Sequence, residues 1–490
     1  MFASVTSVAL VGVEPRPVEV EVHIGGGGKR FTIVGLPDAS VREAKDRVRA
    51  AFAVSAYDFP QRDVIVNLSP ADLPKAGSAY DLPIALGVLS AAKIVDPALP
   101  PVVALGELAL DGGLRPAVGS LAAAVVAARL GLPCVLPAGS QGLGAISGPV
   151  DIVPARRLSE AVAGALGHPT GCAVSDEVAP VERAVADLRD VRGQDGARRA
   201  LELAAAGGHH LLMTGPPGAG KTMLARCLPS LLPPLTSDEV LEVALAWGAA
   251  GLAKTEGDLA PFRSPHHSAT LPAIVGGGSG VPVPGEVTLA HRGVLFLDEL
   301  GEFPVSMLDA LRQPVEDGRV VVARKGASVT FPSQFQLVAA SNPCPCGYSG
   351  DYLKSCRCAQ RAVDRYQSRF SGPLLDRFDL RVRVARLEPE ELVGPVAESS
   401  DVVRGRVVAA RKRQMARGCL NRELSRAALD GMDWSDGAIH VLMRSVRSDA
   451  ITARGWDRVR RVAVTLADLD ESAVVADTHV AEALAFRGAA

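Results

Sequence analysis

The chain has 490 residues, of which 48% are hydrophobic and 22% are charged, and its formal net charge is −2. This length exceeds one ordinary hydrophobic core and predicts about three domains. The composition is typical of a globular protein, and the near-neutral net charge gives by itself no indication of a nucleic-acid partner.

The N-terminus and the apolar runs argue against an exported or membrane-bound protein. The first residues lack a basic segment and reach Glu14 before an apolar core can develop, unlike a signal peptide. No run approaches the roughly 20 apolar residues needed to span a bilayer. We therefore expect a cytoplasmic protein without a membrane partner, in which thiols stay reduced.

Residues 1–166 alternate strand and helix patterns. Apolar residues recur at every second position from Val18 to Ile24, which predicts a strand with one buried face. Ser40 and Glu43 have the spacing of a capping box, which predicts a helix through about Phe52. The first segment is therefore predicted to be a mixed α/β domain.

The rest of the chain divides into three further segments. Residues 167–188 lose the periodicity and gather Pro, Gly, Ser and charged residues, which predicts a linker. Residues 189–388 alternate apolar strands with helical stretches, as in a parallel sheet covered by helices. Residues 389–490 are helical in pattern. Between 401 and 461 they carry 14 Lys and Arg against 7 Asp and Glu, a balance that would suit an anionic partner.

A complete phosphate-binding motif follows the apolar run 211–214. It consists of Gly215, Pro216, Pro217, Gly218, Ala219, Gly220, Lys221 and Thr222. The order strand, G-x-x-x-x-G-K-[ST], helix predicts a loop whose backbone amides hold the phosphates of ATP at a helix N-terminus. Lys221 is expected to reach the β and γ phosphates, and the Thr222 hydroxyl to bind Mg²⁺.

Two further strand ends are predicted to complete a hydrolytic site. The apolar run 294–297 leads into Asp298 and Glu299. Asp298 is expected to hold Mg²⁺ through water, and Glu299 to activate the attacking water. Asn342 follows the apolar run 335–340, where it would hydrogen-bond phosphate and water without adding charge. Apart from the phosphate motif, an acidic pair after an apolar run would be equally compatible with an ordinary strand end.

Four of the eight cysteines follow directly after Asn342. They are Cys344, Cys346, Cys356 and Cys358, two C-x-C pairs separated by nine residues. Four thiolates are enough for a closed, structural Zn²⁺ site. Because C-x-C is less diagnostic than C-x-x-C, reduced thiols or an iron–sulfur cluster remain alternatives. A metal clamp at this place would fix Asn342 and a surface insertion together.

Several long motifs resemble one known family. They are FTIVGLPD at 31–38, NLSPADLPK at 67–75, APFRSPHHSAT at 260–270, VLFLDEL at 294–300, NPCPCGY at 342–348 and SGPLLDRFDL at 371–380. With them the chain resembles, nearly from end to end, the ComM/YifB family of magnesium-chelatase-like AAA+ proteins. The resemblance implies an α/β fold: a P-loop AAA+ domain with a helical lid, preceded by a Lon-protease-like (ribosomal S5-like) domain.

The resemblance also implies residue roles at subunit boundaries. Arg377 matches the arginine finger, which would reach the γ-phosphate bound by a neighbouring subunit of a hexameric ring. A second arginine, the sensor 2 residue, would lie in the lid, where Arg454 is favoured over Arg458. Either of these lid residues could instead be an ordinary helix arginine.

The N-terminal segment departs from Lon at its catalytic positions. The position of the Lon nucleophile is Ala79 here, with Ser78 one residue earlier, and the position of the catalytic lysine falls near Leu121. Without a lysine base, Ser78 has no evident activator. We therefore expect a scaffold or binding domain rather than a peptidase.

A DNA contact is predicted at a basic turn. Residues 319–331 have the pattern of two strands around a turn that carries Arg324 and Lys325. The resemblance to AAA+ ring helicases implies that this hairpin projects into the central pore, where the two cations would contact phosphates without reading sequence. An exposed charged turn is the alternative. The Gly- and Pro-rich stretch 260–287 is too long for a plain connector. Its His266 and His267 would line the pore, simply occupy a turn, or bind a metal.

Three functions are compatible with these features. The first is a hexameric, ATP-dependent DNA translocase or helicase that promotes branch migration in homologous recombination, as in natural transformation. Its substrates would be single-stranded and branched DNA, and recombination proteins are possible partners. The second is a magnesium-chelatase-like ATPase that acts on a protein partner without DNA. A Lon-like protease is disfavoured by the missing Ser/Lys pair.

Overall fold

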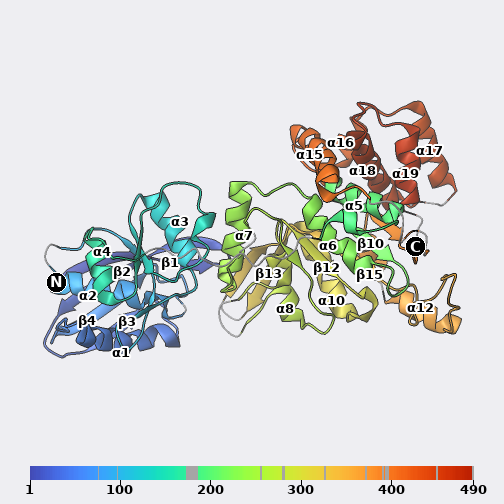
Figure 1. Cartoon of the computed structure of the whole chain (residues 1–490). Coiled ribbons are helices and arrows are strands. Elements are labelled where there is room, and N and C mark those ends of the chain that lie inside the picture. Colours follow the sequence, from blue (N-terminus) through green and yellow to red (C-terminus); the bar gives the residue numbers. More distant parts are fainter. Residues whose placement is uncertain are drawn as a thin grey trace.

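The computed structural model describes residues 1–75, 77–95, 98–172, 186–253, 257–278, 282–324, 327–369, 372–388, 391, 397–448 and 451–487. Figure 1 shows two α/β bodies side by side, with a group of helices against the second. The side chains of residues 324, 327, 372, 373, 453 and 454 lie outside the description. Within the described ranges, no helix has the length and apolar character required to cross a bilayer.

The N-terminal body is built on a seven-stranded sheet with the order β3-β4-β2-β1-β5-β8-β9. Its strands are β1 (Phe2–Val11), β2 (Glu14–Gly25), β3 (Phe31–Val34), β4 (Asp63–Ser69), β5 (Val103–Ala104), β8 (Cys134–Pro137) and β9 (Ile152–Ala155). β6 (Glu107–Leu108) and β7 (Leu114–Arg115) pair separately. The helices are α1 (Ala39–Val54), α2 (Asp81–Ala92), α3 (Ser120–Leu130) and α4 (Leu158–Ala165).

The predicted strand in this body is confirmed, whereas the predicted helix cap was wrong. On β2 the alternating residues Val18, Val20, Val22 and Ile24 are buried in one core. Helix α1 begins at Ala39, and its cap is Asp38, whose carboxylate accepts the Val41 N–H at 2.8 Å. The same carboxylate accepts the Gly77 N–H at 2.9 Å. An aspartate caps a helix as well as a serine does, and this second bond ties it to the adjoining loop.

The central body contains a five-stranded parallel sheet with the order β11-β12-β15-β10-β16. Its strands are β10 (Leu211–Thr214), β11 (Phe262–Arg263), β12 (Val294–Leu297), β15 (Gln336–Ser341) and β16 (Leu380–Arg383). Its helices are α5 (Asp195–Gly207), α6 (Lys221–Leu231), α7 (Ser237–Ala249), α8 (Leu271–Val275), α9 (Glu286–Leu289), α10 (Val305–Ala310), α11 (Arg312–Asp317), α12 (Gln360–Ser368) and α13 (Gly372–Leu375).

Both faces of this sheet are buried. Met213 and Phe296 face one core with α5 and α6, whereas Leu212 and Leu297 face a second core with α10. The second core also receives β13 (Arg319–Arg324) and β14 (Ala327–Pro332), an antiparallel pair that confirms the two predicted strands. The parallel order brings the carboxyl ends of β10, β12 and β15 to one edge, where ligands bind in open α/β sheets.

The C-terminal part that the structure describes is helical, as predicted. It comprises α15 (Ser400–Ala416), α16 (Arg426–Asp430), α17 (Asp436–Arg447), α18 (Ala453–Leu469) and α19 (Asp477–Ala485). Several arginines of this basic segment pair with carboxylates of the same chain. The pairs include Arg406 with Glu202 and Glu398, Arg413 with Glu471, Arg417 with Asp468, and Arg460 with Asp430. Much of its positive charge is therefore already matched within the protein.

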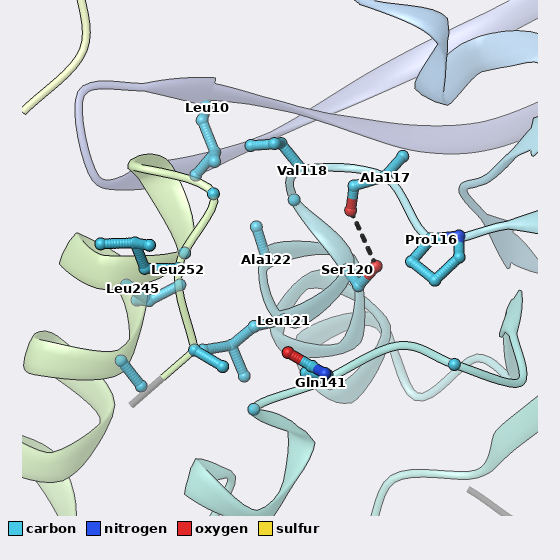
Figure 2. Close-up of a pocket in the computed structure, with 17 residues that line it drawn as sticks. Leu10, Pro116, Ala117, Val118, Ser120, Leu121, Ala122, Gln141, Leu245 and Leu252 are labelled. Atoms are coloured by element: carbon cyan, nitrogen blue, oxygen red, sulfur yellow. Dashed lines mark hydrogen bonds between the residues drawn. The ribbon is translucent and has the colours of Figure 1, made fainter. Parts of the chain in front are cut away.

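The N-terminal and central bodies meet at small apolar contacts. Leu121 and Val125 of α3 pack on Ala244 of α7. Beside this contact, Figure 2 shows Leu10, Leu121 and Leu252 around a hollow of about 310 Å³. The side chains that line the hollow are mainly small and apolar, so it has the character of a loosely packed domain junction.

Candidate ATP site and cysteine cluster

The phosphate loop, residues 215–222, connects the end of β10 to the start of α6. Gly218 and Gly220 have φ of +79° and +90°, conformations that other residues adopt only with strain. A Cβ atom at Gly215 would lie 2.1 Å from the carbonyl oxygen of Val384. The glycines are thus required by the backbone path, and α6 presents its N-terminus to any anion in the loop.

Lys221 links the phosphate loop to the next strand end. Its Nζ donates to the carbonyl oxygens of Gly215 at 2.7 Å and Pro216 at 2.9 Å, and to Oδ1 of Asn342 at 3.3 Å. Burial lowers the pKa of Lys221, whereas the nearby Asp298 and Glu299 act in the opposite direction. The structure therefore brings Lys221, the predicted phosphate lysine, together with Asn342, which is predicted to hydrogen-bond phosphate and water.

The two residues predicted to hold Mg²⁺ are in direct contact. The Thr222 hydroxyl donates to Oδ2 of Asp298 at 2.7 Å. Hydroxyl and carboxylate oxygens are the hard ligands that Mg²⁺ requires, so the donor set fits the ion. Glu299 follows with φ of +50°, and its N–H donates to Oδ1 of Asp298 at 2.9 Å. All these residues line one hollow of about 470 Å³, together with Asn342.

The four clustered cysteines converge. Their Sγ atoms all lie within 4.8 Å of one another, and the three measured pairs are separated by 3.4, 3.6 and 3.6 Å. Four sulfurs placed tetrahedrally at 2.3 Å from Zn²⁺ are about 3.8 Å apart. Backbone N–H donors of Tyr348 and Arg357 lower the pKa of Cys346 to about 6, which favours the thiolate. The cluster therefore fits one tetrahedral ion and is too compact for several irons.

The cysteine cluster packs directly against the phosphate loop. The Gly347 N–H donates to the Cys344 carbonyl oxygen at 2.9 Å, which closes a turn. A Cβ atom at Gly347, where φ is +83°, would lie 2.5 Å from Cδ of Pro217. On its other side the insertion is tied to β16 by a hydrogen bond from Arg383 to the Gly350 carbonyl oxygen. The cluster therefore braces the loop from outside.

The predicted finger Arg377 lies at the opposite edge of the sheet. Asp379 directly precedes β16, and its N–H donates to the His210 carbonyl oxygen at the amino end of β10. The Arg377 side chain is 15% exposed and is paired with Glu316. Arg377 and Arg458 line one hollow at this amino edge. The structure therefore does not bring Arg377 to the phosphate loop of its own chain.

One of the two lid arginines, Arg458, also belongs to this amino edge. Nε of Arg458 lies 3.8 Å from Oδ1 of Asp379, and burial lowers the pKa of Arg458. Arg454 lies one turn earlier in α18, and its side chain is outside the described residues. The choice of Arg454 over Arg458 as sensor 2 stays a prediction.

The structure describes the basic turn, which is predicted to contact DNA, only as far as the end of the first strand. Arg324 is the last residue of β13, and Lys325 lies outside the described residues. The strands themselves are firmly seated, since Val320, Val322 and Phe331 are buried against Ile274 of α8. The hairpin is therefore anchored in the same core that supports β12.

His267 lies beside the acidic pair of the candidate ATP site, a position that the sequence did not indicate. Nδ1 of His267 lies 3.5 Å from Oε2 of Glu299. From its sequence context, His267 was expected to occupy a turn, to line the pore or to bind a metal. Its closeness to the acidic pair in space could not be read from a separation of about 30 residues.

The Lon-like catalytic positions carry no catalytic pair. Ala79 is buried in an apolar cluster with Ala122, and Leu121 packs toward α7. The Ser78 hydroxyl donates to the carboxylate of Glu107. A carboxylate at this place supplies no lysine base, so the geometry gives no support to a peptidase.

Family models and related proteins match this chain over nearly its whole length. Residues 187–392 match the family model "Magnesium chelatase, subunit ChlI", residues 20–140 match "Subunit ChlI of Mg-chelatase", and residues 397–487 match the ChlI C-terminal model. The chain is 42% identical to the uncharacterized protein YifB of Escherichia coli, covering 98% of this chain and 96% of that protein. It is 40% identical to the competence protein ComM of Haemophilus influenzae, with coverages of 99% and 97%.

A shorter similarity involves a protease. The chain is 32% identical to Lon protease 2 of Bacillus subtilis over 27% of this chain and 26% of that protein. Together with the parallel sheet and the helical C-terminal part, these matches confirm the predicted fold class.

Proposed function

Because the chain belongs to the ComM/YifB family of magnesium-chelatase-like AAA+ proteins, we propose that it is an ATP-dependent hexameric DNA translocase that promotes branch migration in homologous recombination, as in natural transformation. The observation that carries the proposal is the full-length similarity to a protein named for competence. The family is of the ATPase type, and the assembled phosphate site supports ATP hydrolysis by this chain.

In the proposed reaction each residue of the phosphate site has one task. Lys221 neutralises the β and γ phosphates, and Thr222 and Asp298 hold Mg²⁺, which supplies charge compensation when bound. Glu299 accepts a proton from water as the water oxygen attacks the γ-phosphorus and the bond to the β-γ bridging oxygen breaks. Asn342 orients the water and the γ-phosphate by hydrogen bonds.

The two edges of the sheet support action between subunits. The phosphate loop lies at the carboxyl edge, whereas Arg377 and Arg458 lie at the amino edge. In a head-to-tail ring the arginine edge of one copy meets the phosphate loop of the next. In a closed hexamer, Arg377 would therefore act on the nucleotide bound by the neighbouring subunit, which explains its distance from the phosphate loop of its own chain.

The decisive test of the DNA proposal is the ATPase rate with and without forked or four-way DNA, measured alongside strand displacement. We expect stimulation and unwinding, both absent in Lys221→Ala.

Replacing Arg324 and Lys325 by alanine should reduce the ratio of DNA-stimulated to DNA-free rate, because these cations contact phosphates. An ATPase indifferent to every DNA would contradict the translocase proposal. That result would favour the second candidate, a chelatase-like motor acting on a protein, to which the family models point.

We also propose that the cysteine cluster holds one structural Zn²⁺. The ion would close the turn that packs on Pro217, so its loss should loosen the phosphate loop. In Cys356→Ser we expect bound zinc to be lost and nucleotide affinity to fall about tenfold, equivalent to about 1.4 kcal/mol.

Zinc content by mass spectrometry and fluorescent-nucleotide titration check this prediction. Cys419→Ser is the matched control, since Cys419 is a free cysteine outside the cluster. A wild-type protein without zinc, or a zinc-free variant with undiminished nucleotide affinity, would contradict it.

A further inference from the structure

The loop that carries the two histidines is fixed at both ends. Before it, Arg263 makes a two-pronged ion pair with Glu286, with distances of 2.7 and 2.8 Å. After it, the Thr270 side chain accepts the Ala273 N–H and caps α8. Between these anchors the Ala269 N–H donates to the His266 carbonyl oxygen at 2.9 Å. The loop therefore presents its side chains from a defined backbone.

The two neighbouring histidines have different surroundings. His266 is exposed and bonds within the loop, with its Nδ1 2.7 Å from the Ser268 hydroxyl. His267 is partly buried, with its ring centroid 4.0 Å from that of His266, tilted by 34°, and with its ring edge-on to the buried Phe303 at 6.4 Å. The ring of His267 is therefore held in place by packing, whereas that of His266 faces solvent.

His267 contacts Glu299, the predicted general base. Glu299 has a 58% exposed side chain on a flexible stem, so it needs an external partner to keep one orientation. Nδ1 of His267 lies 3.5 Å from Oε2, and a small rotation of the carboxylate completes a hydrogen bond. Engagement of Oε2 leaves Oε1 available to accept a proton from water.

We propose that His267 is a positioning residue that orients the carboxylate of Glu299 toward the attacking water. The inference rests on the proposed ATP hydrolysis and is independent of DNA. Its physical basis is that a general base must be held within hydrogen-bond reach of the proton it removes. Lys221 and Thr222 are hydrogen-bonded to groups other than His267. A change at His267 should therefore affect the chemical step and not the binding of the nucleotide.

The test is the DNA-free ATPase of the full chain. For His267→Ala we expect kcat to fall about tenfold to a hundredfold, because displacing a reacting group by about 1 Å costs up to this much. KM for ATP and nucleotide affinity should stay unchanged. His267→Gln, which retains an N–H donor, should restore most of kcat. Ser264→Ala is the matched control and should stay within about twofold of wild type, since Ser264 is an exposed residue of the same loop.

A double-mutant cycle separates positioning from general structural damage. In the Glu299→Gln background, removal of His267 should cause no further loss in the single-turnover rate, because no carboxylate remains to be oriented. A full additional loss there, a normal kcat in His267→Ala, or an equal fall in nucleotide affinity would each overturn the inference. A wild-type chain that binds ATP without hydrolysing it would overturn both this inference and the proposed ATPase.

Discussion

Arg377→Ala should lower kcat for ATP hydrolysis by about a thousandfold or more, since arginine fingers contribute about 10³–10⁵ to kcat. Nucleotide affinity should change little, because Arg377 lies at the amino edge of the sheet and the phosphate loop lies at the carboxyl edge. The finger must leave Glu316 to reach a neighbouring nucleotide. Steady-state ATPase and fluorescent-nucleotide binding measure the two effects separately.

A mixing experiment tests whether the arginine acts between subunits. Arg377→Ala retains an intact phosphate loop, and Lys221→Ala retains an intact finger. Co-expressed, the two inactive variants should recover part of the activity, because some interfaces then contain one intact member of each kind. Arg404→Ala is the control, since Arg404 is a surface residue of α15 paired with Asp401. Half of wild-type activity in Arg377→Ala alone, or no recovery on co-expression, would contradict action in trans.

Glu299→Gln is the second large effect. General-base catalysis contributes about 10²–10⁴ to rate, so kcat should fall by this factor. ATP should still bind, because Lys221 and the Thr222–Asp298 pair remain intact. The variant is therefore expected to accumulate in the ATP-bound form, which rapid-quench and nucleotide-retention measurements detect.

Glu302→Gln is a suitable control for the base. Glu302 lies three residues further along, with a half-exposed side chain 3.9 Å from Arg369. Its neutralisation removes the same charge without touching the proposed water, so activity should change little. Equal losses in the two variants would show that charge near the site, and not a base at Glu299, controls the rate.

The assembly of the candidate nucleotide site was largely predictable because its parts are local in sequence. The phosphate motif fixes its own backbone path through Gly218 and Gly220, and the acidic pair ends an apolar run that forms β12. Asn342 was predictable because the carboxyl ends of parallel strands share one edge. The helix cap at Asp38 was missed because two acceptors, Asp38 and Ser40, lie near the same helix start and only the fold selects between them.

The sequence by itself determined which residues are the candidates for the chemistry: the phosphate loop, the acidic pair and the cysteine cluster. Only the tertiary structure decided which distant residues they contact. The strand order set Arg377 at the edge opposite the phosphate loop, the turn at Gly347 placed the cysteines on Pro217, and the loop after β11 brought His267 to Glu299. Local periodicity records which face of an element is buried but not which distant segment covers it, because that choice is made by packing across the whole sheet.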